Sequence, residues 1–264
     1  MTAPIPRDIP DLPAIPGMVA PTLLPSGYVP ATAVMNPVRR PLTAVFRLLV
    51  AGTAAAGVTI ELLVGSPVRV LSHFAIQSNI LLAVVMALSA RRAWSARRPL
   101  PALVTGAVLL YIVITALVHH LLLTGTTPTF SLTNAPGVHP FRQTVANHIL
   151  VTITPAAAVL DWLLLTTPGR LHLRQAATWL LYPLAYLLFC LGRGELILPG
   201  TPGRYLYPFL DADRHGYKGA LANALLLGLS FYALAILLVA LDHLRPDPMR
   251  HLGKTGFRLR PPVG

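Results

Sequence analysis

The fold is decided by runs such as GALANALLLGLSFYALAILLVAL, residues 219–241, which contains no charged side chain over 23 residues. A helix needs about 20 apolar residues, at ~1.5 Å rise per residue, to cross the ~30 Å hydrocarbon core of a bilayer. Polar and apolar residues do not alternate in this run as they would in a barrel strand. The run is therefore predicted to be a transmembrane helix.

Five more runs of this kind precede it, at residues 43–64, 71–90, 102–123, 145–166 and 176–198. The uncharged part of the fifth run stops at Gly192. Pro155 and Pro183 fall inside the fourth and fifth runs, where proline is tolerated because neighbouring helices can satisfy the carbonyls it frees. We predict an all-α integral membrane protein, a bundle of six transmembrane helices.

Composition excludes a soluble domain with a charged shell. Hydrophobic residues make up 54% of the chain and charged residues 11%, against about 25% charged residues in a typical soluble protein. The net charge of +12 comes from 21 Lys and Arg against 9 Asp and Glu. In a membrane protein the positions of basic residues indicate which side of the membrane each loop faces. No nucleic-acid partner is therefore expected. The single cysteine, Cys190, excludes an internal disulfide and a metal site built from thiolates.

Three regions follow from the composition. The first 41 residues hold ten prolines, a density that resists helix, so residues 1–41 are predicted to form a disordered cytoplasmic tail. Because no basic start leads into a compact apolar stretch, we expect no cleaved signal. Residues 42–243 form the six-helix transmembrane domain, and residues 244–264 form a basic cytoplasmic tail. No soluble partner of the proline-rich tail is assigned.

The basic residues predict that both termini lie inside. With that orientation, fourteen of them fall in cytoplasmic segments, including Arg39, Arg40 and the four arginines of residues 91–98. Five fall on the opposite side: Arg69, Arg142, Arg204, Arg214 and Lys218. Short loops rich in Lys and Arg stay in the cytoplasm, so the topology is N-in and C-in. The basic segments also attract anionic lipid head groups.

Polar side chains gather near the outer ends of the spans. Ionisable residues inside a membrane are costly and suggest function. We therefore expect an outward-side polar cavity that binds a lipid or amphiphile, lined by Glu61, His73, Gln77, Asn79, His119, His120, Asn147, Arg193 and Asn223. Glu61 and Arg193 have opposite charges at similar depth, so we expect them to pair. The alternative is that these polar groups only bond neighbouring helices at head-group level.

Catalysis in such a cavity would need a hydroxyl beside a histidine base. The candidates are Ser78 and Thr152 as hydroxyls and His148 as the base. Ser and Thr in membrane helices more often bond their own backbone. The outer histidines lack a zinc-binding spacing, and no metal or other cofactor is predicted. Asp211 and Asp213 either bind a cation or cap the sixth span as a solvated turn.

Several motifs together resemble a known family. HFAIQSNILL in span two, NHILVTITPAAAVLDWLL in span four, and YPLAYLLFCLGRG followed by YLYPFLDADRHGY resemble the bacterial proline-rich six-transmembrane protein family. That family is similar to the androgen-induced, FAR-type membrane proteins of animals. The resemblance covers residues 43–242 and implies a bacterial cytoplasmic-membrane protein. It also implies intramembrane hydrolysis of fatty acid esters of hydroxy fatty acids.

The resemblance places the family's threonine nucleophile at Ala75 and its histidine base at Val151. Neither alanine nor valine can attack a carbonyl or move a proton. Either the alignment is displaced by a turn, or Ser78 and His148 have taken over, or the chain has lost this chemistry. We therefore expect a membrane protein that binds a lipid or amphiphile. The alternatives are a lipid ester hydrolase with a relocated nucleophile and base, and a transporter.

Overall fold

The computed structural model describes residues 39–124, 140–199, 201 and 203–246. Every regular element within this part of the chain is a helix. Six helical segments are long and apolar enough to cross a membrane, which confirms the predicted six spans. Most of the proline-rich tail and of the basic C-terminal tail, residues 1–38 and 247–264, lie outside the described residues.

Three spans are single helices: α2 Pro41–Val64, α4 Phe74–Trp94 and α10 Ala212–Leu244. The third span is α5 Ala102–Leu117, continued by the π-helical η1 Val118–Leu123. The fourth consists of α6 Pro140–His148, η2 Ile149–Ile153, α7 Thr154–Leu160 and η3 Asp161–Leu165, of which η2 and η3 are π-helical. The fifth consists of α8 Leu173–Trp179 and α9 Leu181–Leu196. Short helices α3 Pro67–Leu71 and η4 Pro208–Leu210 connect spans.

The predicted boundaries differ most at the sixth span. Its helix begins at Ala212 rather than at residue 219, because it continues through a kink at Gly216. There φ is 66° and ψ is 164°, a conformation that glycine adopts readily because it has no Cβ. Charged residues precede the kink, which is why the apolar pattern alone places the start later.

Side chains from neighbouring helices satisfy the carbonyls that both prolines leave without a backbone donor. In η2, the Thr154 N–H donates to the Ile149 carbonyl, the i→i+5 pattern of a π-helix. The next donor in that pattern would be residue 155, but Pro155 has no N–H. Asn79 Nδ2 on α4 donates to the freed Leu150 carbonyl at 3.0 Å.

Pro183 repeats this arrangement in the fifth span. The carbonyl four residues before it belongs to Trp179, the last residue of α8. Tyr111 on α5 donates its hydroxyl proton to that carbonyl at 2.9 Å. The expectation that neighbouring helices satisfy the freed carbonyls is therefore confirmed at both prolines.

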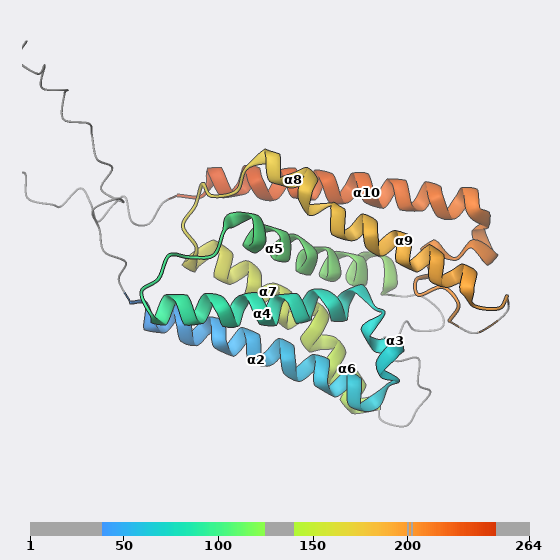
Figure 1. Ribbon diagram of the computed structural model, residues 1–264, viewed down its shortest axis with the longest axis horizontal. Coiled ribbons are helices and arrows are strands. Elements are labelled where there is room, and N and C mark those ends of the chain that lie inside the picture. The colour runs from blue at the N-terminus through green and yellow to red at the C-terminus, as the bar shows by residue number, and fades with distance from the viewer. Residues whose placement is uncertain (1–38, 125–139, 200, 202, 247–264) are drawn as a thin grey trace, which may run out of the picture. The chain divides into compact units, whose positions relative to one another are not determined.

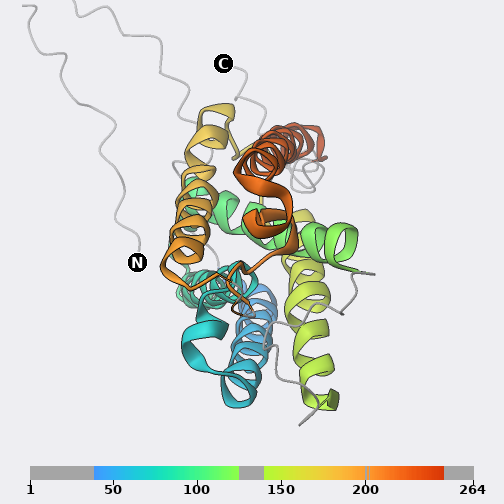
Figure 2. The ribbon, with the colours of Figure 1, turned by 90° about the vertical axis from the view of Figure 1, so that its right-hand side faces the viewer.

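Helix α5 is central in the bundle and contacts α4, α7, α8 and α10. Helices α2 and α4 pack closely along their lengths and lie side by side in Figures 1 and 2. The described chain starts and ends at the same end of the bundle, shown at the left of Figure 1. We call this the Asp242 end and the opposite end the α3 end.

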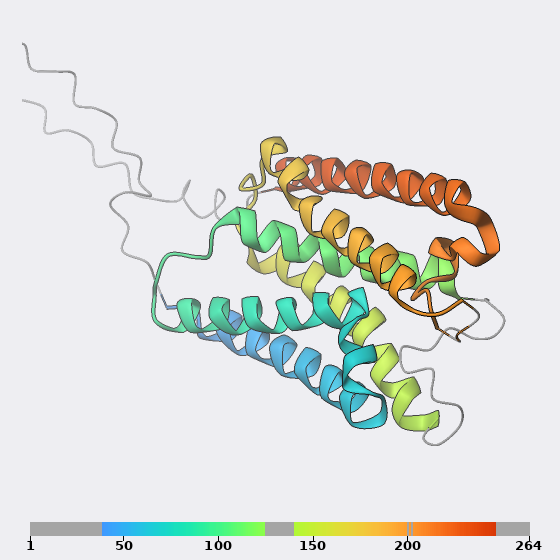
Figure 3. The same ribbon diagram turned by 45° about the vertical axis from the view of Figure 1, so that its right-hand side comes forward.

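The last two spans pack less tightly than the others. Helix α9 buries only Tyr186, Cys190 and Gly194. Helix α10 buries no residue between Ala220 and Ala235. In Figures 1 and 3 the two helices lie close together near α8 and diverge toward the α3 end. Sparse burial along both helices leaves room for a cavity between them and α5.

Candidate functional site

A cavity of about 610 Å³ lies between α5, α9 and α10. It extends from Tyr207 and the residues of η4 to Ala177 on α8. Its inner wall is formed by the start of α4, α5, η1 and η2, and its outer wall by α9 and α10. The volume lies within the ~300–1,000 Å³ typical of small-molecule sites.

Most side chains that line the cavity are apolar, and among them only His119 is a histidine, acid, lysine or arginine. His119 is half-buried in η1. Thr115 lies one turn earlier on the same face, and its hydroxyl contacts that of Ser78 at 2.8 Å and donates to the Tyr111 carbonyl at 3.0 Å. The site is therefore a largely apolar chamber with one histidine among the described residues that line it.

Tyrosines line the end of the cavity near η4. Tyr186 donates its hydroxyl proton to the Ser72 carbonyl at 2.8 Å and accepts from the Phe74 N–H at 3.1 Å. Burial raises the pKa of the Tyr207 hydroxyl above its usual range. Because deprotonation is disfavoured, Tyr207 lines the cavity as a neutral group.

The positions at which the resemblance places a nucleophile and a base both lie in the cavity wall. Ala75 is buried near the start of α4 and Val151 is buried in η2, and both line the same cavity. Neither side chain carries a reactive atom. The chamber therefore has no nucleophile–base pair at these two positions.

A hydroxyl–imidazole pair lies elsewhere, on exposed side chains of η1 and η2. His120 Nε2 is 3.1 Å from Thr152 Oγ1. The rings of His119 and His120 meet edge to face at 5.3 Å. Of the predicted catalytic residues, Thr152 thus has a histidine partner, but that partner is His120 rather than the predicted His148, which is exposed at the end of α6.

Ser78 and Asn79 are fully buried and bond neighbouring helices. The Ser78 hydroxyl contacts Thr115 and donates to the Ala75 carbonyl at 3.1 Å. Asn79 Oδ1 accepts from the Thr154 hydroxyl at 2.6 Å. Neither residue lines the cavity. Ser78 and Asn79 therefore agree with the alternative interpretation, in which polar groups in the spans bond neighbouring helices.

The predicted pair between Glu61 and Arg193 does not form. Arg193 Nη1 donates to the carbonyls of Gly203 at 3.1 Å and of Arg204 at 2.9 Å. The chain after α9 turns back at Gly203, where φ is 77°, and so presents these carbonyls to the guanidinium. Glu61 is only 1% exposed, and neither carboxylate oxygen has a hydrogen-bond partner within the described residues.

The remaining predicted cavity residues are dispersed. Gln77 accepts from the Tyr182 hydroxyl at 2.6 Å, and Asn223 Nδ2 donates to the Phe209 carbonyl at 3.0 Å. His73 is buried just before α4, its ring edge-on to that of Tyr207 at 6.1 Å. Asn147 is half-buried on α6. Of the nine residues predicted to line a cavity, only His119 lines this one.

The loop before α10 caps that helix. Asp211 accepts from the backbone N–H groups of Asp213 at 3.0 Å and Arg214 at 3.3 Å. Of the two interpretations of this acidic loop, the structure supports the helix cap. Within the described ranges, no group of three or more His, Cys, Asp or Glu side chains is arranged to hold a metal ion.

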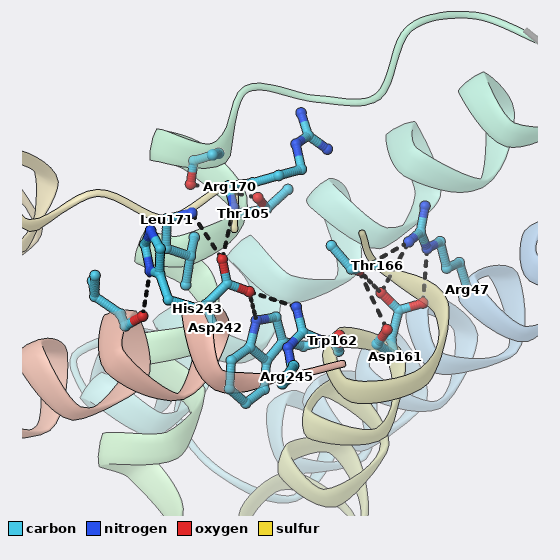
Figure 4. A network of polar contacts seen from close by, with 12 residues as sticks. Arg47, Thr105, Asp161, Trp162, Thr166, Arg170, Leu171, Asp242, His243 and Arg245 are labelled. Atoms are coloured by element: carbon cyan, nitrogen blue, oxygen red, sulfur yellow. Dashed lines mark hydrogen bonds and ion pairs between the residues drawn. The ribbon is translucent and has the colours of Figure 1, made fainter. Parts of the chain in front are cut away.

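A polar network holds the Asp242 end together (Figure 4). Arg47 on α2 forms a bidentate ion pair with Asp161 at the start of η3, at 2.8 and 3.1 Å. Asp242 near the end of α10 accepts from Trp162 Nε1 at 3.1 Å and from the N–H groups of Arg170 and Leu171 at 2.8 and 2.9 Å. The network therefore joins both ends of the described chain to the segment between spans four and five.

Thr115 and the outer wall of the cavity were not predicted from the sequence. Thr115 and His119 are four residues apart, a spacing that puts two side chains on one helix face, and this signal was available. The leucines of α9 and α10 carry no such signal, because any transmembrane helix contains them.

Comparison with known proteins does not assign a function to this site. No family model matches the chain, and neither a curated protein nor a solved structure matches it. The resemblance drawn from the motifs remains a prediction.

Proposed function

We propose that this membrane protein binds the apolar chain of a lipid or amphiphile in the chamber between α5, α9 and α10. The observation that carries the proposal is a volume of about 610 Å³ lined mostly by apolar side chains, with His119 as the one histidine, acid, lysine or arginine among the described residues that line it. Apolar lining with a few placed polar groups is the usual make-up of a ligand site. The proposal replaces the expected polar cavity with an apolar one.

We further propose that the protein lies in the cytoplasmic membrane of a bacterium with both termini inside. The bias of basic residues supports the orientation. The position of both ends of the described chain at the Asp242 end agrees with an even number of spans. The bacterial membrane rests on the resemblance alone.

Binding is tested with cis-parinaric acid, a fluorescent fatty acid that accepts energy from tryptophan. Trp179 precedes cavity-lining Leu180 in the chain, so bound probe should quench tryptophan emission. Gly228 lines the cavity, and a Cβ there meets no atom within 4 Å. We expect Gly228→Leu to fill part of the chamber and weaken binding about tenfold, equivalent to ~1.4 kcal/mol.

Gly192→Leu is the matched control. Gly192 lies on α9, outside the cavity lining, and its added Cβ also meets no atom within 4 Å. It should bind the probe as the unmodified protein does. Equal loss in both variants, or no saturable quenching in the unmodified protein, would contradict the proposal.

A lipid ester hydrolase is the second candidate, and the 3.1 Å contact between Thr152 and His120 favours it. A histidine within hydrogen-bond reach of a hydroxyl can act as its general base. Both segments are π-helical, a feature that often marks functional sites. In this proposal Thr152 is the nucleophile and His120, rather than His148, is the base.

The hydrolase is tested by labelling the purified protein with a fluorophosphonate. Thr152→Val and His120→Gln should each abolish labelling. Ser78→Ala should leave it intact, because Ser78 is fully buried and bonded to Thr115. Absence of labelling from the unmodified, monodisperse protein would set this candidate aside while leaving lipid binding open.

A further inference from the structure

The two walls of the cavity differ in how exposed their residues are. The inner wall consists of buried residues such as Phe74, Ile114 and Val151. On the outer wall, Leu184 of α9 and Leu225 of α10 line the cavity although they are 54% and 66% exposed. A residue that both lines a cavity and is exposed marks its opening. The chamber therefore opens between α9 and α10.

Helix α10 is held mainly at its two ends, and along its middle only partly buried side chains such as Phe231 and Leu234 pack against the core. At the α3 end, Asn223 donates to the Phe209 carbonyl and Arg204 pairs with Asp213 at 2.6 Å. At the other end, Asp242 accepts from backbone and indole N–H groups. No residue between Ala220 and Ala235 is buried. This sparsely packed middle faces α9 across the opening.

The opening lies within two membrane-spanning segments, so the medium outside it is hydrocarbon. Its exposed residues are mostly leucines, among them Leu181, Leu184, Leu225 and Leu229; they carry no charge, and the one polar group among them is the Tyr232 hydroxyl. An acyl chain crosses such an opening without leaving an apolar medium, whereas a polar solute would first lose its water. The opening therefore suits a ligand that already resides in the bilayer.

His119 indicates which part of the ligand is polar. Among the described residues it is the only histidine, acid, lysine or arginine on the lining, beside the hydroxyls of Thr115, Tyr186, Tyr207 and Tyr232. The Thr115 hydroxyl is already bonded to Tyr111 and Ser78, and the Tyr186 hydroxyl to the Ser72 carbonyl. One imidazole and a few hydroxyls in an otherwise apolar chamber match a molecule with one small polar end and one chain. The volume also lies in the ~300–1,000 Å³ range filled by single small ligands, which favours one chain over a whole diacyl phospholipid.

We propose that the ligand is a single-chain amphiphile of the membrane, that it enters sideways between α9 and α10, and that its polar end contacts His119. This inference rests on the proposed lipid-binding function and specifies the ligand class and its route. The amphiphile enters from the bilayer when the middle of α10 moves away from α9.

The route is tested by tying the two helices together. Leu184→Cys and Leu225→Cys are combined with Cys190→Ala, and the pair is closed with the shortest bis-methanethiosulfonate reagent that links it. The protein is reconstituted in phosphatidylcholine vesicles, and uptake of cis-parinaric acid is followed by tryptophan quenching. We expect linking to slow uptake by at least roughly tenfold, since gating motions set such rates, and reduction to restore it.

Controls separate the route from binding itself. The double-cysteine variant before linking sets the reference rate, and each single-cysteine variant treated with a monofunctional reagent should take up the probe faster than the linked protein. If linked protein takes up the probe at the unlinked rate, the route is overturned while lipid binding stands. If unlinked protein shows no saturable quenching, the proposed function fails and the route with it. A linked band at twice the monomer mass would also overturn the route, because it would place a second copy at the opening.

The polar end is tested with two probes. His119→Leu should weaken binding of cis-parinaric acid about tenfold, equivalent to ~1.4 kcal/mol. It should leave 1,6-diphenylhexatriene, a rod of similar character without a polar end, unaffected. His243→Leu is the control, because His243 is exposed near the end of α10 and does not line the cavity. Equal effects of His119→Leu on both probes would show that the residue only shapes the chamber.

Discussion

At the scale of single residues, Asn79 shows how a polar group in a span serves the fold. Sequence alone suggested a cavity residue, because an amide deep in a membrane suggests function. The structure shows that its Nδ2 bonds the Leu150 carbonyl, the acceptor that Pro155 leaves without a backbone donor. The proline on one span and the amide on another therefore form one structural unit.

Removing the amide should destabilise the protein. Asn79→Leu leaves a buried carbonyl with fewer donors, a loss of about 1–3 kcal/mol. Adding Pro155→Ala supplies an N–H that can bond the Leu150 carbonyl, so the double variant should recover part of the loss. The measurement is the thermal unfolding midpoint in detergent. If Pro155→Ala brings no recovery in the Asn79→Leu background, the two residues do not act together.

Sequence could identify which residues are polar but not which partners they meet. Glu61 and Arg193 have opposite charges at similar depth, yet Arg193 binds the carbonyls of the turn at Gly203. Depth along a span follows from counting residues, whereas a partner depends on how helices are rotated and how loops fold back. The six spans could therefore be predicted by counting residues. Most of the site could not, because its contacts depend on helix rotation and on the path of the loops.

At the scale of elements, hydropathy located each span because transfer into hydrocarbon depends on composition over about 20 residues. It did not show π-helical turns in η1, η2 and η3, which change which faces align. Pro155 was the visible sign of a break in span four. The ion pair between Arg47 and Asp161 joins span one to span four. In the sequence these residues are only two charges near the same side of the membrane.

That ion pair should behave as a buried one. Arg47 and Asp161 side chains are 13% and 7% exposed. Arg47→Met leaves a carboxylate uncompensated and should cost about 3–5 kcal/mol. Adding Asp161→Leu removes the orphaned charge, so the double variant should be more stable than the single one. Chemical unfolding in mixed detergent micelles measures both; a double variant less stable than Arg47→Met would show that Asp161 contributes through other contacts.

At the scale of the whole molecule, the cavity results from how unevenly the six spans are packed. In the first four spans, between 33% and 56% of the residues in the most apolar stretch are buried, whereas in spans five and six the share is 17% and 22%. A hydropathy profile treats all six alike, because it records what a helix is made of and not what it touches. The chamber was therefore beyond prediction even though every helix that forms it was predicted.

The orientation of the molecule is tested by two matched serines. Ser66 precedes α3 and Ser95 follows α4, so they lie at opposite ends of the bundle, and both are exposed. The Ser66 side chain forms no cap hydrogen bond, and Ser95 caps α4 through its backbone N–H, so Ser66→Cys and Ser95→Cys in a Cys190→Ala background should fold normally. Because Arg91, Arg92, Arg97 and Arg98 flank Ser95, the positive-inside rule places it in the cytoplasm. On intact cells an impermeant maleimide should label Ser66→Cys at once and Ser95→Cys only after permeabilisation. The reverse pattern would invert the topology and place the wider end of the α9–α10 opening toward the cytoplasm.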